Sequence, residues 1–175
     1  WFKPSLPVMF ILSAVAGGIS MSLGLTLITS KILNRQLMPK DLLRDVAKIA
    51  AFVLLGYLYL KMWDWASTSY YSHQPGTADA IARLNLTTPY DQTFWIIEVL
   101  LGGIIPAVVL LNRETRRHDW AVIISTVMIV FGVAVNRWNV TLSGLVVPPN
   151  WSPGVVGNPV AVAYSPSFIE VGVAL

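Results

Sequence analysis

A single carboxylate, Glu98, stands inside the nearly apolar stretch at residues 93–111, TFWIIEVLLGGIIPAVVLL. This stretch is long enough to cross a bilayer, and an acid inside such a segment is costly unless it has a partner or a function. Pro106 removes the hydrogen bond to the Gly102 carbonyl, which predicts a kink or a broken turn, and Gly102 leaves room for a close neighbour. We therefore expect Glu98 to lie in a membrane helix and to face other protein.

Four more charged residues are candidates for the same chemistry: Lys61, Asp64, Arg137 and Glu170. Glu98 lies about 13 Å from the start of its helix and Arg137 about 27 Å from the start of its own. If the two helices run in opposite directions, both charges fall in one half of the membrane. We expect Glu98, Arg137 and Glu170 to form a buried polar cluster, available for a proton path or as an ion pair between helices.

Each of these residues also has a plainer reading. Lys61 and Asp64 are three residues apart at the end of a helix and can pair with each other. Arg137 can snorkel to the membrane surface, and Glu170 can be the acid of a capping box that begins at Ser167. Glu98 is hardest to explain in this way because it lies beyond the first turn.

The composition predicts the elements that must position these residues. Hydrophobic residues make up 55% of the 175-residue chain and charged residues 12%, about half the charged fraction of a soluble domain. We expect an all-α, multi-pass transmembrane bundle forming a single unit over residues 1–175, with about five spans. The expected segments are residues 6–30, 42–65, 93–111, 119–144 and 168–175, with a polar loop over 66–88.

Two further patterns concern helix packing and the membrane surface. Ala14, Gly18, Ser22 and Thr26 recur every four residues, which favours close helix packing at this face, with a ligand-lining face as the alternative. The second segment ends in four aromatic residues that we expect to form a belt at the membrane surface: Tyr57, Tyr59, Trp63 and Trp65.

The basic residues predict an orientation. Lys and Arg concentrate in the first connection, up to Lys48, and in the connection around Arg113, Arg116 and Arg117. These two connections lie on one side if the segments alternate, and the positive-inside rule places that side in the cytoplasm.

Several residue types are missing. The chain has no Cys, which excludes disulfides and a Cys-held iron–sulfur cluster in this sequence, and its two His residues, His73 and His118, fall in different loops and cannot ligate a haem between helices. We expect no bound metal or covalent cofactor. A net charge of +3 is too small to indicate nucleic acid. Because the sequence begins without Met and ends in an apolar run, we expect it to be part of a longer chain.

Three stretches, FWIIEVLLGGIIPAVVLL, GVAVNRWNVTLSGL and YSPSFIEVGVAL, resemble the NrfD/PsrC family of membrane subunits, and most closely its HybB-like branch, found with nickel–iron hydrogenases. The resemblance implies the second half of an NrfD-like helical fold in a prokaryotic inner membrane. It also implies electron exchange between quinone as substrate and a ferredoxin-like iron–sulfur subunit on the outer face, which connects to a catalytic subunit. The quinone site of such proteins is expected outside this sequence.

Glu98, Arg137 and Glu170 are the positions that the resemblance makes candidates for a proton path or structural support. Two other classes stay open. A transporter or channel would use Pro106 and the intramembrane acid as a broken-helix ion site. A pure membrane anchor would need none of the intramembrane charges.

Overall fold

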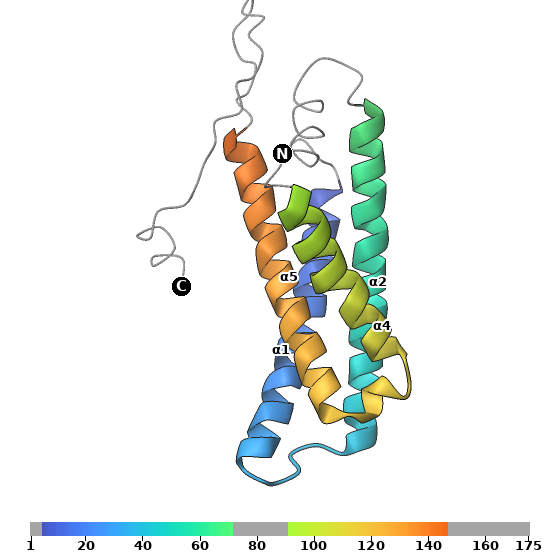
Figure 1. Cartoon of the computed structure of the whole chain (residues 1–175), viewed down its shortest axis with the longest axis vertical. Helices are drawn as coiled ribbons and strands as arrows, with labels where there is room; N and C mark the ends of the chain where they lie inside the picture. The colour runs from blue at the N-terminus through green and yellow to red at the C-terminus, as the bar shows by residue number, and fades with distance from the viewer. Residues whose placement is uncertain (1–4, 72–90, 147–175) are drawn as a thin grey trace, which may run out of the picture.

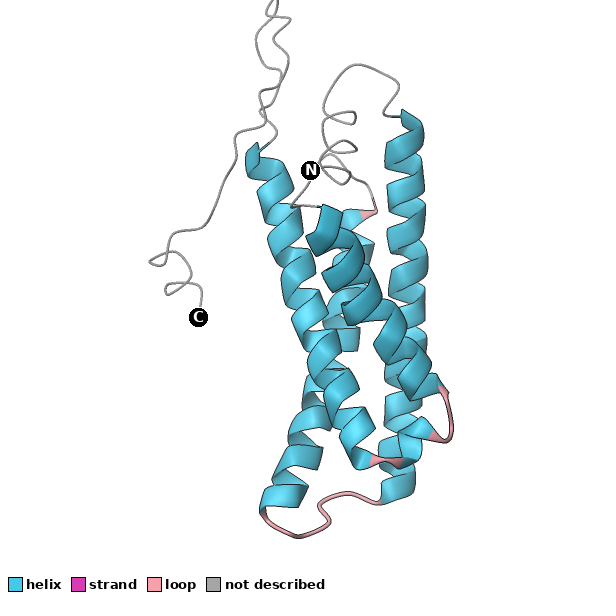
Figure 2. Cartoon of the chain, in the orientation of Figure 1, coloured by secondary structure: helices cyan, strands magenta, loops and turns pink. Residues whose placement is uncertain are grey.

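The computed structural model describes residues 5–71 and 91–146, with the side chains of Tyr71 and of residues 142–146 left aside. The described residues form four long helical rods that run side by side (Figure 1). The elements are α1 (Leu6–Ile32), α2 (Lys40–Tyr71), η1 (Gln92–Ile104) continuing into α4 (Ile105–Leu111), a short turn η2 (Thr115–Arg117), and α5 (Asp119–Val146). Helix is the only regular structure in this part of the chain (Figure 2).

All four rods are long and apolar enough to cross a membrane. Large apolar side chains on these helices, such as Ile11, Phe52 and Phe131, remain 56–64% exposed. Water would penalise that surface, whereas lipid chains solvate it. The predicted all-α, multi-pass membrane bundle is therefore confirmed. The predicted fifth segment, residues 168–175, lies outside the described residues.

The rods are arranged in a ring in which α1 packs on α2 and α5, α5 packs on η1 and α4, and α4 packs on α2. Small and apolar side chains fill the centre, among them Ala47, Leu54, Leu110 and Ile129, each no more than 1% exposed. The connections 33–39 and 112–118 lie at the same end of the bundle, as the alternation of segments predicts (Figure 1).

The helix ends follow local chemistry. α1 stops where Asn34 takes a left-handed conformation, with φ of 48°, which asparagine tolerates better than most residues. The Asp91 carboxylate accepts a hydrogen bond from the Gln92 N–H and caps η1. The start predicted at Thr88 and Pro89 lies outside the described residues.

α2 is about two turns longer than predicted, because residues 66–71 continue the helix instead of beginning a loop. The hydroxyls of Ser67 and Thr68 donate to the Asp64 carbonyl, so these polar residues satisfy themselves within the helix. Thr68 is also buried. Hydrophilicity indicated the end of the membrane span here but not the end of the helix.

The third rod changes its winding between Ile104 and Ile105, next to Pro106. Residues Gln92–Ile104 form a π-helix, and the Ile105 N–H donates to the Leu100 carbonyl, five residues earlier. An α-helix begins at Ile105, and Pro106 lies in its first turn. Proline is tolerated there because an N–H group in the first turn of a helix has no carbonyl partner within the helix. The kink or broken turn expected at Pro106 stays a prediction; the structure shows a change of helix type next to this residue.

Gly102 is the point of closest approach between the third rod and α5. A Cβ atom built on Gly102 would lie 2.5 Å from the Cα of Gly132. Only glycine fits at both positions, so the predicted packing role of Gly102 is confirmed.

The small-residue face predicted on α1 packs on no other described helix. Gly18 and Ser22 are exposed, and a Cβ on Gly18 would meet nothing within 4 Å. The buried face instead contains Ser13, Ser20 and Gly24. The packing prediction is therefore wrong for these four rods. The sequence offers two small faces on one helix, and hydropathy does not distinguish them.

Candidate functional site: a buried ion pair between three helices

Glu98 of η1 is 2% exposed and faces the interior of the bundle. Its carboxylate forms an ion pair with the Lys61 ammonium group of α2. The same carboxylate accepts a hydrogen bond from the Tyr57 hydroxyl at 3.0 Å on Oε1, and one from the Asn139 amide at 2.8 Å on Oε2. Donors from two other helices therefore satisfy both carboxylate oxygens.

Lys61 is also buried, at 7% exposure. Its Nζ donates to the Asn136 Oδ1 at 2.8 Å, in addition to pairing with Glu98. The ammonium group also lies 5.0 Å from the centre of the Phe94 ring, within the range of a cation–π contact. The ring closes one side of the site with a partial negative charge and no hydrogen-bonding atom.

The members of this site lie at one height. Tyr57 and Lys61 are about 26 and 31 Å along α2 from Lys40, at about 1.5 Å per residue. Asn136 and Asn139 are about 26 and 30 Å along α5 from Asp119 by the same measure. The site therefore lies about one membrane thickness from the basic connections, near the opposite boundary of the apolar core.

This arrangement can do two things chemically. It is a neutral unit of one acid and one base in hydrocarbon, which stabilises both charges and links α2, η1 and α5. It also contains adjoining groups able to exchange a proton, since Tyr57, Lys61 and Glu98 are in direct contact. No cluster of three metal-binding side chains occurs within residues 5–71 and 91–146.

The sequence-based prediction that Glu98 has a polar partner inside the bundle is confirmed, but the predicted partner is wrong. Arg137 is exposed, and its guanidinium carbon lies 4.6 Å from the centre of the Phe10 ring on α1. It forms no ion pair in the described part of the chain. Arg137 is one residue from Asn136, and one residue turns a side chain by about 100° around the helix. The matching depths of Glu98 and Arg137 predicted the level of the polar site in the bundle, but not the direction in which the Arg137 side chain faces.

Lys61 and Asp64 are both buried, but they reach different helices. Lys61 reaches Glu98, whereas the Asp64 Oδ1 accepts a hydrogen bond of 2.7 Å from the Ser5 hydroxyl at the start of α1. The side-chain contacts described for these two residues run between helices, and none of them is the predicted pair within α2. Asp64 ties α1 to α2 just outside the ion pair. Glu170 lies outside the described residues.

Sequence reasoning missed Tyr57, Asn136 and Asn139. Tyr57 was expected in a surface belt, but it is 4% exposed and bonded to Glu98, while Tyr59 and Trp63 are exposed as predicted. Two signals point to the site in retrospect. Tyr57 and Lys61 are four residues apart, and Asn136 and Asn139 are three apart, so each pair shares one helix face.

Together, the four apolar rods and the ion pair between them define the class: this chain is part of a multi-pass integral membrane protein with a polar site inside its helical bundle. The family model described as "Polysulphide reductase, NrfD" matches residues 1–149. The chain therefore belongs to the NrfD family.

Two curated relatives come from Nitratidesulfovibrio vulgaris. One is named "Menaquinone reductase, integral membrane subunit"; it is 24% identical over 165 residues, covering 82% of this chain and 37% of the relative. The other, described only as "Protein", is 24% identical over 182 residues, covering all of this chain and 41% of the relative. The chain thus spans about two-fifths of the length of these relatives. No solved structure matches it.

Proposed function

We propose that this chain belongs to a quinone-linked membrane subunit of a respiratory oxidoreductase complex. The observation that carries the proposal is the NrfD match over residues 1–149. The relative named as a menaquinone reductase subunit supports quinone as the substrate and menaquinone as its chemical type. The four described rods would form part of the membrane scaffold beside the quinone-reactive part of the protein.

The proposed partners are an iron–sulfur subunit docked at the outer face and a catalytic subunit beyond it. This sequence contains no Cys to hold a cluster, so the iron–sulfur centre that exchanges electrons with the quinone is proposed to lie on another subunit. The inner membrane of a prokaryote is the proposed location, with the basic connections in the cytoplasm. Within the family we propose the HybB-like branch, on the motifs around Glu98, Arg137 and Glu170.

For the buried site we propose a proton-handling role beside the quinone chemistry. Quinol oxidation releases protons and quinone reduction takes them up. A carboxylate in direct contact with a tyrosine and a lysine can carry protons across the outer part of the bundle. The support for this role is the direct contact of Glu98 with Tyr57 and Lys61 inside hydrocarbon.

The test is purification of the full-length protein from its native membrane, followed by identification of its subunits and assay of quinol-dependent electron transfer. We expect an iron–sulfur subunit to copurify and its clusters to be reduced by menaquinol. Isolation of the protein without such a partner and without quinol-dependent transfer would defeat the proposal. Ion flux in liposomes lacking any redox partner would favour a transporter instead.

A second role for the buried site is purely structural, as a link that holds the three helices together. This role is favoured because both carboxylate oxygens of Glu98 already have partners. Its two carboxylate oxygens are already bonded to Tyr57, Lys61 and Asn139. Glu98→Gln keeps the shape and hydrogen-bonding capacity but cannot carry a proton. With a proton-handling role, electron transfer in the assembled complex falls by about tenfold or more. With a purely structural role, transfer in the assembled complex stays at the wild-type level.

A further inference from the structure

Four arginines converge at the end of the bundle opposite the buried ion pair. They line a polar pocket of about 210 Å³ between the start of α2 and the connection from α4 to α5. Its lining residues are Asp41, Arg44, Asp45, Arg113, Arg116 and Arg117. The arginines outnumber the aspartates two to one, so the pocket carries a net positive charge.

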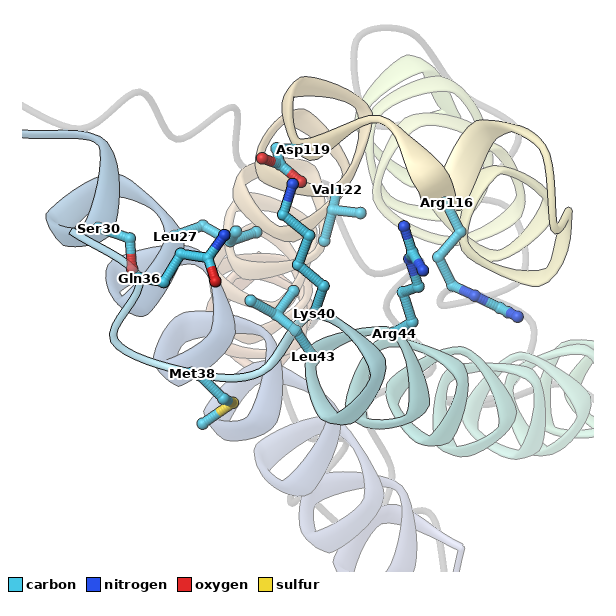
Figure 3. Close-up of a pocket in the computed structure, with 10 residues that line it drawn as sticks. All are labelled: Leu27, Ser30, Gln36, Met38, Lys40, Leu43, Arg44, Arg116, Asp119 and Val122. Atoms are coloured by element: carbon cyan, nitrogen blue, oxygen red, sulfur yellow. The ribbon is translucent and has the colours of Figure 1, made fainter. Parts of the chain in front are cut away.

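A second, smaller pocket of about 50 Å³ adjoins the first and shares Arg44 and Arg116 with it. Figure 3 shows these two side chains in the same region of this pocket, with Lys40 pointing toward Asp119. Leu43 and Val122 contribute apolar side chains to its lining. The polar site therefore continues into the end of the helix bundle and is not a flat surface patch.

The arginines differ in how firmly they are held. Arg116 is fixed, because its Nη1 donates to the Leu110 carbonyl at the end of α4 at 2.8 Å. Arg44 and Arg117 form pairs of 3.3 and 3.4 Å with acids three residues earlier in the chain, Asp41 and Glu114, which are 93% and 76% exposed. Exposed pairs of this kind are weak and exchange readily.

Arg113 forms no hydrogen bond or ion pair with any residue in the described part of the chain. It is exposed at the mouth of the polar pocket. The pocket therefore combines one fixed guanidinium group with three that can turn toward an incoming anion.

In a membrane that these helices span, the pocket would fall near the level of the lipid phosphate groups. It is at the ends of membrane-long helices, and the neighbouring outer surfaces of α2 and α4 carry exposed apolar side chains, including Leu42, Ile49 and Val108. A ligand with a phosphate head and apolar tails can place each part against matching surface. A free phosphate would use only the head site.

We propose that this pocket binds the phosphate group of an anionic membrane phospholipid. Guanidinium groups bind phosphate oxygens through paired hydrogen bonds, and basic pockets between membrane helices suit lipid head groups. The site is independent of quinone chemistry, since it lies at the other end of the bundle from the Glu98 ion pair. Its occupant joins the α2 start to the α4–α5 connection.

The experiment is native mass spectrometry of the full-length protein in detergent, titrated with phosphatidylglycerol or with phosphatidylcholine carrying the same acyl chains. The wild type is expected to bind phosphatidylglycerol more tightly. Arg113→Gln should weaken phosphatidylglycerol binding about fivefold, and Arg117→Gln should have a similar effect, since each removes one charge near the head group. Both changes should weaken phosphatidylcholine binding less than they weaken phosphatidylglycerol binding, because the choline cation offsets the charge of the phosphatidylcholine phosphate.

Arg35→Gln is the matched control, because Arg35 is exposed in the other connection at the same end and lines neither pocket. Unchanged binding in this variant supports the proposal. An equal loss for Arg35→Gln overturns it in favour of general surface charge. Equal binding of the two lipids by the wild type overturns it by showing no recognition of the anionic head group. Displacement of phosphatidylglycerol by millimolar inorganic phosphate overturns the lipid assignment and leaves a soluble anion as the ligand.

Discussion

Removing the Lys61 ammonium group while keeping its apolar stem is the sharpest perturbation of the buried site. Lys61→Met leaves the Glu98 carboxylate, 2% exposed, with only the neutral donors Tyr57 and Asn139. Breaking a buried pair by removing one partner costs about 3–5 kcal/mol, because the remaining charge stays uncompensated. The free energy of unfolding should fall by about this amount.

The double variant Lys61→Met/Glu98→Gln separates loss of charge balance from loss of packing. The introduced glutamine can still accept from Tyr57, and the Asn139 amide can flip to offer its oxygen to the new amide group. The double variant should therefore lose only about 1 kcal/mol, giving a coupling energy of at least about 2 kcal/mol between the two positions.

The assay is equilibrium unfolding of the full-length protein in mixed detergent micelles. Arg137→Met is the control, since this exposed cation lies against the Phe10 ring and forms no ion pair with a described residue, so its loss should cost no more than about 1 kcal/mol. A coupling energy below about 0.5 kcal/mol between Lys61 and Glu98 would refute the reasoning. So would a larger loss from Arg137→Met than from Lys61→Met.

Two further predictions concern packing and topology. Gly102→Ala should lower the free energy of unfolding by about 1–3 kcal/mol, because the new Cβ would collide with the Gly132 backbone. Gly18→Ala is the control and should not destabilise the protein, since a Cβ there meets nothing within 4 Å. Unfolding in detergent measures both variants, and equal losses would contradict the close contact at Gly102. Single cysteines at Gly76 and Asn112, in a chain otherwise free of Cys, should react with an impermeant thiol reagent from opposite sides of the membrane, with Asn112 on the cytoplasmic side. Labelling of both from one side would overturn the predicted topology.

The sequence predicts the membrane spans well because hydropathy follows directly from the need to bury or to lipid-solvate apolar side chains. The first span was expected at residues 6–30 and is Leu6–Ile32, and the last helix was expected from Asp119 and begins there. The burial of Glu98 was predictable for the same reason, since its cost in lipid is high.

Rotation of the helices about their own axes was not predictable in the same way. Depth along a helix follows from residue count, but the facing direction depends on which neighbours are present. Arg137 and Asn136 have nearly equal depth, yet only Asn136 turns inward to Lys61. Gly18 was assigned to a packed face for the same reason and proved exposed.

The π-helical winding of η1 was also beyond reach of the sequence pattern. Pro106 predicts a break, but it does not indicate that the preceding residues widen into π turns. The winding of a helix affects which way its side chains face, and hydropathy does not reveal this winding.

The most direct test of the account is infrared difference spectroscopy of the full-length protein at neutral pH, comparing wild type with Glu98→Gln. If Lys61 holds Glu98 as an ion pair, the wild-type spectrum has an ionised carboxylate band that Glu98→Gln removes. A protonated carboxylic acid band in its place would contradict the ion pair, and with it the site proposed between α2, η1 and α5.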